Sequence, residues 1–213
     1  DIQRPDVGCA RDLPLCHELV HARALAVRHG IGVLQPGLQV VCIQNGILRG
    51  LGFGREINLM SLFVPPKPAG GVSLTAAPNA GMRRIRPLVP ALYTSPVEAF
   101  EVAHQPSAQY LHALFGLRCR EALGLGTPFA PQVVGWLGSI EREAECLVAD
   151  LAQGSLAPHL RLSTGERAAI RVKLRPNRAR AREVAAALAL GPEGLTARLW
   201  PDLRYINTVT SGS

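Results

Sequence analysis

A run of basic side chains in the last third of the chain is its strongest concentration of one chemical type. The run consists of Arg161, Arg167, Arg171, Lys173, Arg175, Arg178, Arg180 and Arg182. Such a run can bind phosphate oxygens, but nucleic-acid binding ideally adds aromatic side chains for base stacking. No aromatic residue lies between Trp136 and Trp200, and Glu166 is the one acidic residue inside the run. The pattern therefore favours a solvated helical face, and nucleic acid is not the expected partner.

Histidine and cysteine spacing offers little for metal binding or nucleophilic catalysis. His17 and His21 are four residues apart and could share one face of a helix, but no third ligand accompanies them. The cysteines, which include no C-x-x-C pair, are Cys9, Cys16, Cys42, Cys119 and Cys146. They are expected to be reduced, buried thiols of a cytoplasmic protein. We assign no metal ligand and no catalytic residue from these patterns.

Sequence motifs for hydrolysis or nucleotide binding are also missing. The chain has no G-x-S-x-G elbow and no G-x-x-x-x-G-K-[ST] loop. The glycine-rich run over 50–54 lacks the lysine that a phosphate loop needs. A self-contained hydrolase is not expected.

Composition places the chain among core-forming proteins. Of its 213 residues, 47% are hydrophobic and 18% are charged, which argues against disorder and favours a single domain. A long uncharged stretch, over 122–140, contains several glycines and prolines and suits a membrane span poorly. We therefore expect a protein that does not enter a membrane.

Hydrophobic periodicity, prolines and glycines predict an alternation of strands and helices. Strands are expected over 38–43, 57–64 and 205–210. Helices are expected over 11–29, from 95 onward, and over 107–123, 127–152, 163–175, 178–190 and 192–200. Ser95 and Ser163 each begin a capping-box pattern. Strands at both ends with helices between them predict an α/β fold, with helices packed on a mixed sheet.

The carboxyl-terminal segment, over 199–213, reads LWPDLRYINTVTSGS. It resembles the R-x-W-P-N-x-K-Y-x-x-x-V-x-T-G-S segment of the Gretchen Hagen family, the auxin-responsive acyl-acid amido synthetases of plants and their bacterial relatives. Shorter matches follow the family's order; they are Leu62-Phe63-Val64, Gly70-Gly71-Val72, Tyr93 to Glu98, Tyr110 to Arg118 and Phe129-Ala130. The matches extend from about residue 51 to 213, whereas residues 1–50 match poorly.

The resemblance implies a ligase. Members of this family use ATP and Mg²⁺ to convert a small carboxylic acid into an acyl-adenylate, which an amino acid then attacks to give an amide. The family's three nucleotide motifs do not occur in this chain. The resemblance thus implies an internal fragment of the large N-terminal domain, inactive alone, from a monomeric cytoplasmic enzyme.

Site residues follow from the same resemblance. Thr127, Pro128 and Phe129 correspond to the start of the helix that lines the acyl-acid pocket. Ser211, Gly212 and Ser213 correspond to a turn beside the nucleotide, and turns at the carboxyl ends of buried strands usually lead into ligand sites. An alternative for Phe129 is a plain core position. Alternatives for the whole chain are a basic helical binding module for nucleic acid or an acidic partner, and a non-catalytic relative of the ligase.

Overall fold

The computed structural model describes residues 54–63 and 86–209. The predicted helix over 11–29 and the predicted strand over 38–43 lie outside the described residues. The chain divides into two units, and every described residue belongs to the second, Gly54–Ser213. This unit is described below by itself.

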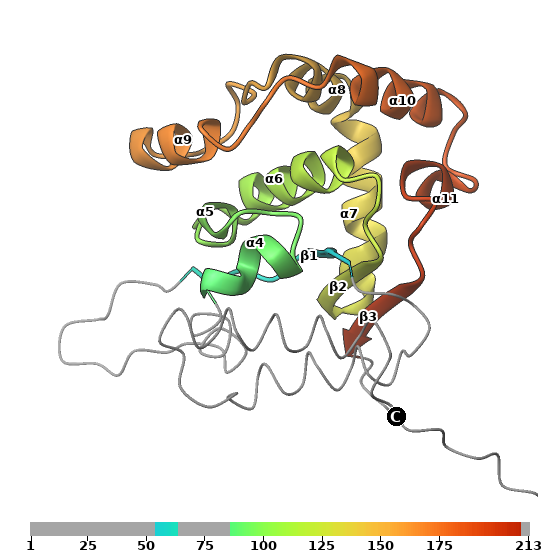
Figure 1. Ribbon diagram of the computed structural model, residues 1–213, viewed down its shortest axis with the longest axis horizontal. Helices are drawn as coiled ribbons and strands as arrows, with labels where there is room; N and C mark the ends of the chain where they lie inside the picture. Colours follow the sequence, from blue (N-terminus) through green and yellow to red (C-terminus); the bar gives the residue numbers. More distant parts are fainter. Residues whose placement is uncertain (1–53, 64–85, 210–213) are drawn as a thin grey trace, which may run out of the picture. The chain divides into compact units, whose positions relative to one another are not determined.

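A small parallel sheet positions the rest of the unit. Its strands are β1 (Glu56–Asn58), β2 (Gly124–Phe129) and β3 (Tyr205–Val209), in the order β1-β2-β3. Both described pairings are parallel, with β2 in the centre. The α/β class with helices packed on a sheet is therefore confirmed (Figure 1).

The first strand is shorter than the predicted strand over 57–64. The side chain of Asn58 ends it, because its Oδ1 accepts a hydrogen bond from the backbone N–H of Met60 at 2.9 Å in a local turn. The chain then leaves the sheet, and the N–H of Leu62 donates to the carbonyl of Phe100 at 2.6 Å. The apolar residues Leu59 and Leu62 are therefore buried in the core although they lie in a loop.

The central strand occupies residues that the sequence assigned to the start of a helix over 127–152. Thr127 precedes a proline, which disfavours helical geometry at that position. Pro128 has no N–H to donate, and the β2–β3 register shifts between Thr127 and Phe129. The helix predicted from Thr127 therefore begins only at Ala130, and it is divided into two helices at Glu143.

Helices cover this sheet and pack on one another (Figure 1). They are α4 (Val89–Leu92), preceded by a 3₁₀ turn (Arg86–Leu88), α5 (Val97–Phe100), α6 (Gln105–Arg118), α7 (Ala130–Arg142), α8 (Ala144–Gln153), α9 (Thr164–Arg171), α10 (Arg178–Ala189) and α11 (Leu195–Leu199). Among these helices, none is both long enough and apolar enough to cross a membrane.

Local start and stop signals account for several helix ends. Ser163 and Glu166 form the predicted capping box at the start of α9. Gly154 ends α8 with a φ of 67°, a left-handed conformation that glycine adopts without strain. The predicted helix at Ser95 is a single turn, and Ser95 does not cap it. Its Oγ lies 2.8 Å from Nδ1 of His112 instead.

Two tryptophans join the distant parts of the core. The rings of Trp136 on α7 and Trp200 after α11 stack with centroids 5.8 Å apart. Trp136 Nε1 donates to the carbonyl of Gln109 at 3.1 Å, and Trp200 Nε1 donates to that of Gly116 at 2.9 Å. Both acceptors lie on α6, so α6 is the element to which α7 and the chain after α11 are fastened.

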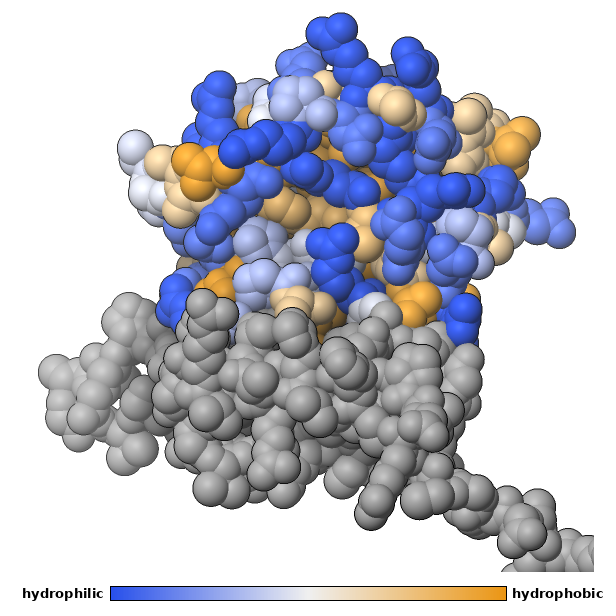
Figure 2. Space-filling model, in the orientation of Figure 1, coloured by the Kyte–Doolittle hydropathy of each residue, from blue (hydrophilic) through white to orange (hydrophobic). Residues whose placement is uncertain are grey.

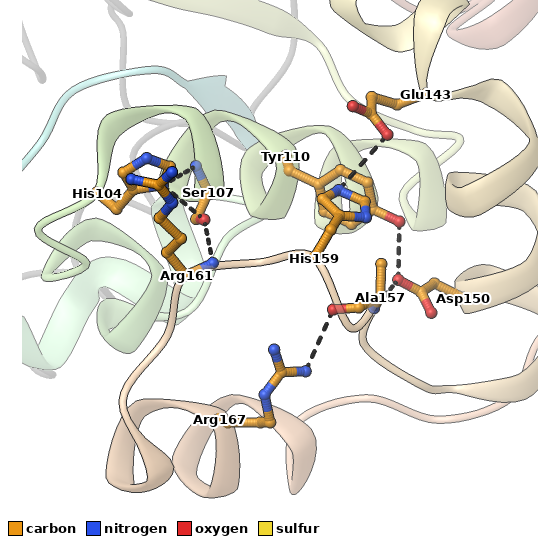
Figure 3. Close-up of polar contacts among 9 residues, drawn as sticks. All are labelled: His104, Ser107, Tyr110, Glu143, Asp150, Ala157, His159, Arg161 and Arg167. Atoms are coloured by element: carbon orange, nitrogen blue, oxygen red, sulfur yellow. Dashed lines mark hydrogen bonds and ion pairs between the residues drawn. The ribbon is translucent and has the colours of Figure 1, made fainter.

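A buried carboxylate organises the other side of α6 (Figure 3). Asp150 on α8 is 4% exposed, and its Oδ2 accepts hydrogen bonds from the Tyr110 hydroxyl at 2.8 Å and from the Ala157 N–H at 2.7 Å. Its Oδ1 accepts a third from the Ser155 hydroxyl at 2.7 Å. One side chain therefore connects α6, α8 and the loop that follows Gly154.

His112 is expected to make folding sensitive to acid. Its ring lies within the core against Phe100, and burial lowers its pKa to about 4. Between pH 6.5 and 4, His112 is protonated in the unfolded chain but stays neutral in the folded chain, so stability falls as the pH falls. We expect this group to remove about 3 kcal/mol of the free energy of unfolding between pH 7 and 4.

Urea unfolding at a series of pH values measures this loss. The His112→Asn variant should show a flatter dependence than the wild type, whereas replacing the exposed His159 by glutamine should leave the wild-type dependence. Equal slopes in wild type and His112→Asn would show that folding leaves the pKa of His112 unchanged.

Candidate functional site

The carboxyl ends of the three strands meet at one edge of the sheet, where ligands bind in open parallel sheets. Thr127 of β2 pairs with Thr208 of β3, and Phe129 pairs with Val209. Two of the three residues predicted to bind the acid therefore lie at this edge. The third, Pro128, lies between them in β2.

Phe129 is the exposed member of this group. It is 62% exposed, so it is not a core residue of the described unit. It directly precedes α7, whose first turn receives no side-chain cap. An aromatic ring beside uncapped N–H groups can contact both the apolar body and the polar end of a ligand.

Thr127 is buried and has a different role. Its hydroxyl donates a hydrogen bond to Oε1 of Gln132 at 2.5 Å. Gln132 is in the first turn of α7, so this bond fixes the helix start relative to the strand. Thr127 is 6% exposed. Its role is therefore to hold the start of α7 against the end of β2.

Ser211, Gly212 and Ser213, the predicted nucleotide-binding turn, lie outside the described residues. They follow β3, which ends at Val209 beside Phe129. The Thr208 Oγ1, one residue before that end, is buried and has no hydrogen-bond partner in the described part of the chain.

The sheet also carries a partly buried carboxyl that sequence reasoning missed. Glu56 on β1 accepts hydrogen bonds from Asn58 Nδ2 at 2.8 Å and from the Tyr205 hydroxyl at 3.4 Å. Burial, the largest cause, raises the pKa of Glu56 above its ordinary value, and the two hydrogen bonds oppose this shift. The side chain lies over Gly126, where a Cβ would overlap it. The alternation of Gly124 and Gly126 is the sequence signal that could have revealed this space.

The structure separates the basic run into different roles. Arg180 is 5% exposed and donates to the carbonyls of Leu117 and Leu199. Arg167 donates to three backbone carbonyls in the loop before α9. These two side chains are structural, which leaves fewer cations for the predicted solvated face.

One group of side chains in the described ranges could hold a metal ion. It consists of Glu143, Cys146 and His159, whose donor atoms all lie within 4.8 Å of one another. Glu143 and His159 also form an ion pair at 3.6 Å, and both are substantially exposed (Figure 3). Glu143 follows the end of α7 farthest from Phe129, so this group is not part of the strand edge. The other predicted pair, His17 and His21, lies outside the described residues.

Comparison with known proteins decides the family. A sequence model of the GH3 family N-terminal domain matches residues 31–213. The chain belongs to the GH3 family. The match confirms the resemblance inferred from the motifs, and it begins about thirty residues before the first of them.

Curated relatives of this GH3 chain are plant proteins. It is 24% identical over 179 residues to the indole-3-acetic acid-amido synthetase GH3.3 of Arabidopsis thaliana, covering 80% of this chain and 30% of the relative. It is 29% identical over 185 residues to the probable indole-3-acetic acid-amido synthetase GH3.13 of Oryza sativa subsp. japonica, covering 82% and 39%. The chain thus spans about a third of the length of these relatives.

Solved structures agree on the fold. The GH3.15 acyl acid amido synthetase superimposes with a TM-score of 0.68 at 19% identity, over 82% of this chain and 32% of that one. A second structure, AtGH3.15 in complex with 2,4-DB, superimposes with the same TM-score at 18% identity. The predicted α/β fold, that of the N-terminal domain of the GH3 family, is confirmed.

Proposed function

We propose that this chain forms part of the N-terminal domain of an acid–amino acid ligase, and that the strand edge at Phe129 helps to hold the carboxylic acid. Membership of the GH3 family carries this proposal. The names of the relatives support it, since they are amido synthetases and one solved structure is a complex with 2,4-DB. By the same argument, the substrates of the intact protein are a small carboxylic acid and an amino acid.

The residues at the edge divide the work. The exposed Phe129 ring gives an apolar surface for the body of the acid. The uncapped first turn of α7 offers backbone N–H groups and a partial positive charge to its carboxylate. Thr127 keeps the helix start in place through Gln132.

The nucleotide is proposed to lie beside the same edge, held in part by Ser211, Gly212 and Ser213. Bound ATP with Mg²⁺ would supply the adenylyl group that activates the carboxylate. The buried, unpartnered hydroxyl of Thr208 supports this location, because a polar ligand beyond β3 could satisfy it. We assign no described residue to Mg²⁺.

Amide synthesis tests the proposed function. The protein encoded by the full-length reading frame that contains this chain is incubated with ATP, Mg²⁺ and a mixture of amino acids. One carboxylic acid of the indole, benzoate or aliphatic class is added at a time. Mass spectrometry is expected to detect an amide that requires every component, and the 213-residue chain alone is expected to form none. Absence of an amide with all of the acids, together with salt-sensitive binding to duplex DNA, would favour the basic binding module.

Replacing Phe129 by alanine should weaken use of the acid specifically. Loss of the ring removes apolar contact with the acid, so the KM for the acid should rise about tenfold. The KM for ATP should change less than about twofold. Val134→Ala, at another exposed apolar position in α7, is the matched control and should change neither value. Equal effects of the two substitutions would remove Phe129 from the site.

A further inference from the structure

A cavity lies at the opposite end of the sheet from Phe129. It has a volume of about 630 Å³. Arg55, which directly precedes β1, and Arg118, which ends α6 ahead of β2, both line it. The cavity is therefore next to the amino-terminal ends of the strands, apart from the edge proposed for the acid and the nucleotide.

The wall of this cavity carries an excess of positive charge. The basic side chains that line it are Arg55, Arg86, Arg118 and Lys173. Arg86 pairs with Glu101 at 2.8 Å, and Lys173 pairs with Glu98 at 3.6 Å. In the described ranges no carboxylate forms an ion pair with Arg55 or Arg118. All Asp and Glu residues between positions 54 and 213 are described, so this unit has no other acidic side chain to offer them.

Within residues 54–63 and 86–209, Arg118 lacks both a carboxylate partner and a hydrogen-bond partner for one of its nitrogens. Its Nη1 is buried and has no hydrogen-bond partner among the described residues. Burial, followed by the like charges of Arg175 and Arg55, lowers the pKa of Arg118 below its ordinary value. Arg118 as a whole is half-buried, and a half-buried guanidinium without a carboxylate partner is stabilised when an anion offsets its charge.

The hydroxyl of Thr94 also lacks a hydrogen-bond partner within these ranges. Thr94 lines the cavity and is 8% exposed, and its Oγ1 is buried with no partner in the described part of the unit. The two residues with these unsatisfied atoms, Thr94 and Arg118, therefore both line this cavity. Such groups in a folded protein indicate a missing ligand or water.

The same wall has an apolar side. Tyr93, Phe115, Pro87 and Pro90 line it together with the cationic residues. The cavity volume exceeds what an inorganic oxyanion needs, so there is room for an organic group beside the anion. On the face shown in Figure 2, hydrophilic side chains dominate the described surface and apolar ones form small separate patches.

We propose that this cavity binds a small phosphorylated molecule, with its phosphate between Arg55 and Arg118 and its apolar body against the proline and aromatic wall. A phosphate monoester carries nearly two negative charges at neutral pH, which offsets the two unpaired guanidinium groups. Arginine binds phosphate through paired N–H groups, and a nearby threonine hydroxyl adds a donor. This proposal does not depend on the proposed ligase activity.

Calorimetric titration of the 213-residue chain tests the site at constant ionic strength. The probes are phenyl phosphate, inorganic phosphate and benzoate. We expect phenyl phosphate to bind most tightly, inorganic phosphate to bind more weakly, and benzoate to bind at least tenfold more weakly than phenyl phosphate. If inorganic phosphate binds as tightly as phenyl phosphate, the apolar wall plays no part and that half of the proposal fails.

Variants locate the binding. Arg118→Gln and Arg55→Gln should each weaken phenyl phosphate at least tenfold, and Arg55 is exposed, so its replacement tests the site without a threat to folding. Arg120→Gln, at an exposed position outside the cavity wall, is the matched control and should bind as the wild type does. Binding that survives both substitutions, or no binding of any phosphate, would overturn the proposal.

Thermal unfolding without ligand gives an independent result. Because the Arg118 charge is uncompensated, Arg118→Gln should raise the melting temperature of the free chain by roughly 2–4 °C and abolish the shift caused by phenyl phosphate. A lower melting temperature for this variant, with no phosphate-induced shift in the wild type, would show that Arg118 has an acidic partner elsewhere in the chain.

Discussion

Replacing Asp150 by alanine is expected to destabilise the protein by about 4 kcal/mol. The substitution leaves the Tyr110 hydroxyl and the Ala157 N–H buried without their acceptor (Figure 3). It also removes the acceptor of the Ser155 hydroxyl. Charged acceptors contribute more than neutral ones, and an unmatched buried donor bears its full desolvation cost. Such a loss is a large fraction of the stability of an ordinary domain.

Urea unfolding followed by fluorescence of Trp136 and Trp200 measures this effect. Tyr110→Phe removes one of the three hydrogen bonds to Asp150 and should cost about 1 kcal/mol. Glu145→Ala, at an exposed acidic position on the same helix, serves as the control and should change stability by less than about 0.5 kcal/mol. An Asp150→Ala effect no larger than that of the control would mean that the network is not formed in solution.

Loss of the Arg180 side chain should be similarly severe, at about 3–5 kcal/mol for Arg180→Ala. Its Nε donates to the Leu117 carbonyl at 2.8 Å, and Nη2 donates to the carbonyl of Leu199. These carbonyls lie in the last turns of α6 and α11, where helices leave acceptors unsatisfied and favour a cation. Glu183 accepts from Nη1 at 2.9 Å and offsets part of the charge.

Two substitutions separate charge from geometry at this position. Arg180→Lys keeps the charge but has no planar fork to reach two carbonyls, so it should recover less than half of the loss. Arg182→Ala, two residues along α10 and exposed, should change the free energy of unfolding by less than about 0.5 kcal/mol. Full rescue by lysine would show that charge alone is needed near these helix ends.

Local sequence signals predicted much of the helical structure. The capping box at Ser163 sets the start of α9, and Gly154 ends α8. Helix α10 was predicted over 178–190 and is observed over Arg178–Ala189. These signals depend on residues within a few positions of one another, so a single sequence contains all the information that they need.

The central strand could not be predicted in this way. Residues 124–129 form β2 because β1 and β3, from distant parts of the sequence, pair with them on both sides. Strand formation depends on such neighbours more than on intrinsic preference. The apolar residues after Pro128 were therefore interpreted as one long helix that included Thr127.

The candidate site shows the same division. Thr127 and Phe129 were predicted from the family resemblance, and the register with β3 shows why these positions lie at a shared edge. The carboxyl of Glu56 and the unpaired guanidinium of Arg118 arise from residues brought together by folding. The alternation of Gly124 and Gly126 marks the space that Glu56 fills, but no comparable spacing marks Arg118.

Exchange of labelled pyrophosphate into ATP tests the central claim most directly. The protein encoded by the full-length reading frame that contains this chain is incubated with ATP, Mg²⁺, labelled pyrophosphate and one carboxylic acid at a time, without an amino acid. We predict exchange that depends on the acid and that falls when Phe129 is replaced by alanine at subsaturating acid. No exchange with any of the acids, or exchange that does not depend on an added acid, would contradict the account.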